Sequence, residues 1–198
     1  MNLTIANHEM QFVVLHAAVL AKGQDAVVFP APPGSGKSTL TTYLAFSGWR
    51  LMSDEMTLLK PHSLSVTPFV RPICLKNQSI QLAKQWFPDG TFSTIARDTH
   101  KGDVIHLSPP DNAWDNQSQQ AEIKAIIFPQ YQANTKFEVY ILNEAQAFSS
   151  LSKNAFNYGV AGDIGFKSLV NAAQKVPCFE VNYNNIADLE GVIETEIF

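Results

Sequence analysis

The sequence predicts an α/β fold in which a mixed sheet is covered by flanking helices. Strand-like and helical segments alternate along the chain, which favours this class over an all-α or all-β domain. The chain has 198 residues, 45% of them hydrophobic and 16% charged, and such a composition is typical of a folded domain with a sizeable core. A glycine-containing loop near residue 34 also lies between an apolar strand and a helical segment. We therefore expect a single domain over residues 1–198.

The first third of the chain gives the clearest local signals. Two aliphatic, β-branched runs flank a turn at Gly23 and predict a hairpin. A loop then leads into a helix that Gly48 ends, and two short strands follow. The expected strands are 12–20, 26–29, 49–53 and 56–59, and the expected helix is 38–46.

The remaining two thirds contain an irregular middle segment and a regular C-terminal part. In the middle, only a helix ended by Pro88 and a strand halted by Pro109 and Pro110 are expected. The expected helices are 78–86, 144–155, 164–174 and 186–194, and the expected strands are 104–107, 123–128, 137–142 and 178–183.

Charge and apolar patterning exclude several classes of protein. The formal net charge of −4 lacks the basic stripe of a nucleic-acid module, so no nucleic-acid partner is expected. The longest apolar stretch, 12–20, is too short for a membrane span, and the N-terminus lacks the basic region of a signal peptide. Cys74 and Cys178 are far apart and typical of thiols in a reducing compartment. We therefore expect a cytoplasmic protein.

The strongest chemical signal is the segment Ala31-Pro-Pro-Gly-Ser-Gly-Lys-Ser-Thr39, which fits the P-loop pattern except that Ala31 replaces the first glycine. Glycines let backbone amides approach phosphate oxygens, and the positive end of the following helix favours the same anion. A lysine here binds the outer phosphates of a nucleotide, and the next hydroxyl binds Mg²⁺. The predicted nucleotide-binding residues are Pro33, Gly34, Ser35, Gly36, Lys37, Ser38 and Thr39.

Two adjacent carboxylates and a histidine are candidate catalytic groups. Asp54 and Glu55 follow a strand that we expect to run parallel beside the strand preceding the loop, which places them near the phosphates. In such a pair, one carboxylate can remove a proton while the other assists Mg²⁺. His16 interrupts an apolar strand, and we expect it to hydrogen-bond Asp54 and tune its basicity.

These segments resemble the catalytic domain of bacterial HPr kinase/phosphorylase, and most closely the related group called HPr-kinase-related kinases. The resemblance covers residues 13–59: a histidine strand, a hairpin, the P-loop, and Gly48-Trp-Arg-Leu-Met-Ser-Asp-Glu55. It implies the P-loop fold shared with phosphoenolpyruvate carboxykinase and suggests a homo-oligomer. We expect the chain to depart from HPr kinase in lacking its separate N-terminal domain. Glu55 stands where the family has a second aspartate, and the family's Arg-Gly-rich segment is not found.

The resemblance implies an ATP-dependent kinase that transfers the γ-phosphoryl group to a hydroxyl, such as a serine, of a protein, peptide or small molecule. It assigns Asp54 and His16 as the base pair, and Lys37 as the cation at the phosphates. Ser38 and Glu55 would hold Mg²⁺.

Phosphoryl transfer also needs cations around the developing charge, and the irregular middle segment supplies the candidates. Arg71, Lys76 and Lys101 all lie there. We expect Arg71 and Lys101 to contact phosphate or substrate, because the Pro or Gly that follows each one rigidifies its loop.

Two other functions stay open on sequence grounds. The first is a small-metabolite P-loop kinase, although such chains place the loop nearer the N-terminus and carry an arginine-rich lid. The second is a nucleotide-binding regulatory or interaction module that transfers no phosphoryl group.

Overall fold

The fold comes from a computed structural model that describes residues 11–100 and 102–198. The strands are β1 (Val13–Lys22), β2 (Asp25–Pro30), β3 (Arg50–Ser53), β4 (Met56–Leu59), β5 (Ser65–Thr67), β6 (Ile73–Lys76), β7 (Ala96–Thr99), β8 (Gly102–Leu107), β9 (Ala121–Tyr131), β10 (Glu138–Ile141) and β11 (Cys178–Tyr183). The helices are α2 (Lys37–Phe46), α3 (Gln78–Trp86), α4 (Asp111–Asp115), α5 (Glu144–Lys153), α6 (Tyr158–Lys175) and α7 (Ile186–Glu196).

An eight-stranded mixed sheet forms the centre of the molecule, in the order β10-β11-β9-β2-β1-β4-β5, with β3 also paired to β1. Strands β2, β9 and β11 are parallel neighbours, whereas β1 is antiparallel to β2, β3 and β4. The carboxyl ends of the parallel strands therefore meet at one edge, where the loop after β2 begins. The predicted α/β class with a mixed sheet is confirmed.

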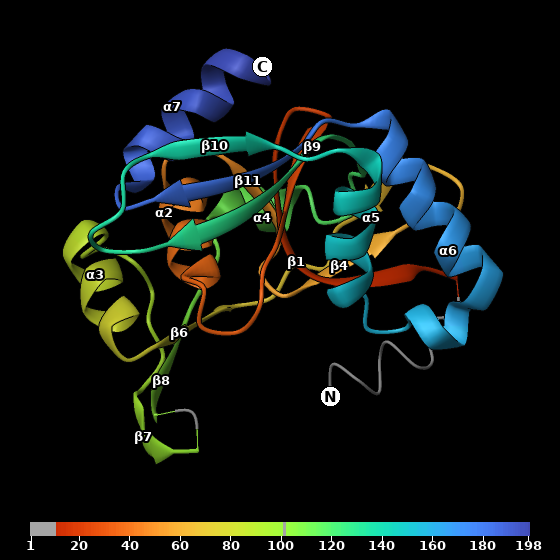
Figure 1. Ribbon diagram of the computed structural model, residues 1–198. Coiled ribbons are helices and arrows are strands. Elements are labelled where there is room, and N and C mark those ends of the chain that lie inside the picture. The colour runs from red at the N-terminus through yellow and green to blue at the C-terminus, as the bar shows by residue number, and fades with distance from the viewer. Residues whose placement is uncertain (1–10, 101) are drawn as a thin grey trace.

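Helices cover both faces of this sheet (Figure 1). In β1, Ala18 and Leu20 pack in one apolar cluster with residues of α2, α3 and α7. Their neighbours Ala17 and Val19 pack in a second cluster with residues of α5 and α6. Because side chains alternate along a strand, His16 lies on the same face as Ala18, which is the face covered by α2.

The strand after α2 lies in a different place from the one we expected. β3 pairs with β1 and not with β2, because β1 folds back against β2 in the hairpin and occupies that edge. β3 and β4 both pair with β1, in one register at Val19–Ser53 and His16–Met56. Asp54 and Glu55 therefore form the short interruption between β3 and β4, which otherwise follow one another along β1. The Met56 amide donates a hydrogen bond to Ser53 Oγ across this interruption, at 3.0 Å.

The middle segment is more regular than expected. It contains β5, α4 and a three-stranded sheet in the order β6-β8-β7, which extends away from the main sheet (Figure 1). The helix expected over 164–174 begins earlier, at Tyr158, and is broken at Gly162, where φ is 52°. Within the described residues, no helix has both the length and the apolar character needed to cross a bilayer.

Candidate functional site

The loop between β2 and α2 has a backbone that needs glycine at two positions. Gly34 and Gly36 have φ values of 88° and 85°, in the left-handed region that glycine adopts without strain. A Cβ on Gly36 would also lie 3.3 Å from Cβ of Tyr131, the last residue of β9. Gly36 is the residue before α2, so this conformation sets the direction in which the helix begins.

A cavity of about 750 Å³ opens beside this loop. It is lined by His16 of β1, by the loop and the start of α2, by Asp54 and Glu55, and by the end of β6 with the start of α3. The first amides of a helix lack intrahelical acceptors, so the start of α2 offers N–H donors and a positive dipole end to the cavity. Of the seven residues predicted to bind nucleotide, only Ser35 does not line it; the Ser35 hydroxyl is buried without a hydrogen-bond partner.

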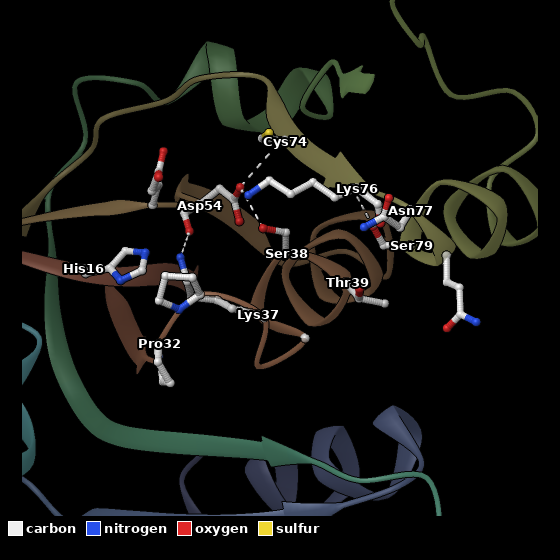
Figure 2. Close-up of a pocket in the computed structure, with 15 residues that line it drawn as sticks. His16, Pro32, Lys37, Ser38, Thr39, Asp54, Cys74, Lys76, Asn77 and Ser79 are labelled. Atoms are coloured by element: carbon white, nitrogen blue, oxygen red, sulfur yellow. Dashed lines mark hydrogen bonds between the residues drawn. The ribbon is translucent and has the colours of Figure 1, made fainter. Parts of the chain in front are cut away.

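Asp54 is a buried carboxylate at the centre of the site. Its Oδ2 accepts hydrogen bonds from Ser38 Oγ at 3.2 Å and from the Cys74 amide at 3.4 Å, as Figure 2 shows. Its Oδ1 is buried and has no hydrogen-bond partner. Burial raises the pKa of Asp54 above its ordinary value, although Lys37 and the two hydrogen bonds oppose that rise. The buried carboxylate therefore binds a proton more tightly than an exposed aspartate does.

Lys37 holds the start of α2 against the break between β3 and β4. Its Nζ donates to the main-chain oxygen of Asp54 at 2.7 Å (Figure 2). Burial lowers the pKa of Lys37, while the negative charges of Asp54 and Glu55 oppose that change. The lysine that the sequence pattern singles out is therefore a buried cation on the cavity wall.

His16 lines the same cavity and packs against Phe156, with the two ring centroids 5.3 Å apart. Burial lowers the pKa of His16 to about 4, and Lys37 acts in the same direction, while Glu55 opposes it. The imidazole is therefore neutral at physiological pH. Among the described residues, the hydrogen bonds to the Asp54 carboxylate come from Ser38 and Cys74, and none comes from His16.

Lys76, at the end of β6, is the cation from the middle segment that lines this cavity. Its side chain points from β6 toward Asp54 and Ser38 (Figure 2). Its charge contributes to lowering the pKa values of both His16 and Lys37, so it acts on the same cavity. The sequence signal for Lys76 is a long cation in the irregular middle segment, without the Pro or Gly neighbour that favours Arg71 and Lys101.

Arg71, one of the two preferred cations of the middle segment, borders a different cavity. Arg71 does not line the larger cavity; it borders a smaller one that shares Asp54 and Glu55. Lys101 lies outside the described residues. The contact of Arg71 with phosphate or substrate stays a prediction, and the cavity that Arg71 borders is the smaller one.

The oxygen donors at the cavity fit Mg²⁺. Mg²⁺ is usually held by one or two carboxylates together with substrate phosphates, so it needs no cage made of protein alone. Ser38 Oγ and the two carboxylates of Asp54 and Glu55 line one cavity, and the unpartnered Oδ1 of Asp54 is a buried oxygen that a cation or a proton would satisfy. Across residues 11–100 and 102–198, no cluster of three or more His, Cys, Asp or Glu side chains forms a metal site.

Among the comparisons with known proteins, only the search of solved structures gives matches. No known protein-family profile matches the chain, and no curated protein does. Among solved structures, the chain is similar to the Hpr(Ser) kinase/phosphatase from Coxiella burnetii, with 15% sequence identity over 92% of this chain and 91% of that chain, and a TM-score of 0.39. A similarity at this level says nothing about activity, so the chemistry of the site rests on its own residues.

Proposed function

We propose that this protein is an ATP-dependent kinase that transfers the γ-phosphoryl group of ATP to a hydroxyl. The observation that carries the proposal is that Lys37, Ser38 and the buried Asp54 meet in one cavity at the start of α2. A cation, a hydroxyl and a carboxylate at a helix N-terminus are the parts that phosphoryl transfer requires. The resemblance of residues 13–59 to HPr-kinase-related kinases points to the same class.

The nucleotide phosphates would lie against the amides of residues 33–39. Gly34 and Gly36 allow close approach of the backbone, and Lys37 supplies charge to the outer phosphates. Lys76 would bind the transferred group from the opposite wall, since its side chain points into the same region. Ser38 and Glu55, with Asp54 beside them, would hold Mg²⁺, which neutralises phosphate charge when it is bound.

Asp54 would act as the base for the acceptor. Its carboxylate takes the proton of the acceptor hydroxyl, the acceptor oxygen forms a bond to the γ-phosphorus, and the bond from that phosphorus to the bridging oxygen of ADP breaks. The raised pKa of Asp54 suits this role, because it makes the ionised carboxylate a stronger base than an ordinary aspartate. We propose that neutral His16 assists Asp54 from the cavity wall.

The test is ATP consumption with Mg²⁺ in the presence of candidate acceptors, comparing wild type with Asp54→Asn. We expect the variant to lose about 10²–10⁴-fold in kcat, the usual contribution of a positioned base. Equal turnover in the two proteins would reject the role of Asp54.

A matched variant separates the two carboxylates. Glu55→Gln keeps the size of the side chain and removes its charge, so we expect it to raise the Mg²⁺ concentration needed for half-maximal activity. Asp54→Asn should lower kcat at saturating Mg²⁺ instead. A protein that binds ATP but transfers nothing to any acceptor would favour the alternative of a nucleotide-binding regulatory module.

A further inference from the structure

A second, smaller cavity lies next to the one that we assign to the nucleotide. Its volume is about 320 Å³, which is at the lower end of the range for small-molecule sites. The two cavities share three lining residues, Asp54, Glu55 and Cys74. The proposed base is therefore in a common wall between two spaces.

An in-line transfer needs a second approach to the base. In such a reaction the attacking and leaving oxygens lie on opposite sides of the phosphorus atom, so the acceptor must approach from the side away from ADP. With the phosphates held at the start of α2, the smaller cavity offers a separate approach to the Asp54 carboxylate.

Besides Ser53 and His106, the remaining walls of the smaller cavity combine apolar surface with one permanent cation. Met56, Phe69 and Pro72 are apolar, whereas Arg71 contributes a guanidinium that stays charged at any physiological pH. The Arg71 guanidinium lies 5.5 Å from the centre of the Phe69 ring, a cation–π contact. A guanidinium held in this way is well suited to a bidentate contact with a carboxylate or a phosphate.

We propose that the smaller cavity is the acceptor site and that it takes a small alcohol carrying one anionic group, a phosphate or a carboxylate. Arg71 binds that group, and the hydroxyl faces Asp54. This inference rests on the proposed kinase function, because it assigns the partner of the same transfer. The size of the cavity favours a small molecule over the surface of a protein.

Cys74 gives a readout that does not depend on turnover. It lines both cavities and is partly exposed, whereas Cys178 is buried and its pKa is raised to about 11 by that burial. Iodoacetamide should therefore alkylate Cys74 selectively. With the larger cavity filled by Mg²⁺ and a non-hydrolysable ATP analogue, the remaining alkylation reports on access through the smaller cavity.

The probes are glycerol 3-phosphate, glycerate and the neutral control glycerol. We expect both anions, and not glycerol, to slow alkylation of Cys74 at millimolar concentration. The anion that protects Cys74 at the lower concentration shows whether the site prefers a phosphate or a carboxylate. Arg71→Met should weaken this protection about 10–100-fold, as loss of a charge-assisted contact does. Arg97→Met is the matched control, because Arg97 is exposed on β7 and outside the cavity lining, and it should leave protection unchanged.

Protection that is absent in wild type, or that survives Arg71→Met, would overturn the proposal. Protection that depends on Arg71 in a protein that shows no transfer to the protecting compound or to any other acceptor would keep the anion site and reject the kinase function instead.

Discussion

Asp54→Asn should make the ligand-free protein more stable at neutral pH while it lowers kcat. The carboxylate is buried, its Oδ1 has no partner, and its raised pKa means that the folded protein disfavours the charged form. Asparagine keeps the oxygen that accepts from Ser38 and Cys74, and it removes the charge. Taking an ion out of water costs several kcal/mol, the hydrogen bonds and Lys37 offset part of that, and we expect a net gain of about 1–2 kcal/mol.

For a chain of this length, that gain corresponds to a rise in Tm of about 2–8 °C. The gain should depend on pH. Because the folded pKa of Asp54 lies above the ordinary value of 3.8, the folded state binds more protons than the unfolded state between these two values. Wild-type stability from this group is therefore lost as the pH rises through the folded pKa, whereas asparagine does not titrate.

Thermal unfolding of both proteins, followed by circular dichroism from acid to neutral pH, measures this difference. The variant should match wild type in acid and exceed it near neutrality. A lower Tm for Asp54→Asn at neutral pH, or a difference that does not change with pH, would refute the reasoning, because it would mean that the charged carboxylate stabilises the fold.

Three further substitutions test other parts of the site. Gly36→Ala places a Cβ at a left-handed φ and 3.3 Å from Tyr131, so it should lower stability by about 1–2 kcal/mol and weaken ATP binding, measured by denaturant unfolding and by calorimetry. His16→Asn should reduce the dependence of stability on pH in acid. The folded pKa of His16, about 4, lies below the unfolded value of 6.5, so the stability that this group contributes falls as the pH drops through that window. An unchanged slope of stability against pH in the variant would contradict this role of His16. Lys76→Met should lower kcat about 10–100-fold with little loss of stability. The control Lys84→Met, on α3, should leave kcat unchanged. Equal kcat values in the two variants would show that Lys76 does not act on the transferred group.

The part of the site that could be predicted is local in sequence. The β1–β2 hairpin, the loop and α2 each carry their own turn, glycine or helix signal, and they bring Lys37 and Ser38 to the same cavity as His16 without help from distant segments. The short spacing between Lys37 and Asp54 predicts that the carboxylate lies near the loop. It does not predict that β3, the strand before Asp54, pairs with β1 and not with β2.

The remainder of the site depends on long-range pairing. Lys76 reaches the cavity because the four residues of β6 pair with β8, and strands of that length carry too little periodicity to be seen in the sequence. Arg71 borders the smaller cavity and not the one lined by Lys37, and no local pattern in the sequence distinguishes the two cavities.

Equilibrium binding of ATP is the most direct test of the central claim, that residues 31–39 and Asp54 form a site for Mg²⁺-bound nucleotide. Titration calorimetry on wild type should give a micromolar or tighter Kd with Mg²⁺ present. Lys37→Met should weaken binding about 100-fold or more through loss of charge-assisted contacts with phosphate, and Ser38→Ala should remove most of the dependence on Mg²⁺. Wild-type protein that binds no ATP, or that binds it as tightly after Lys37→Met, would contradict the account.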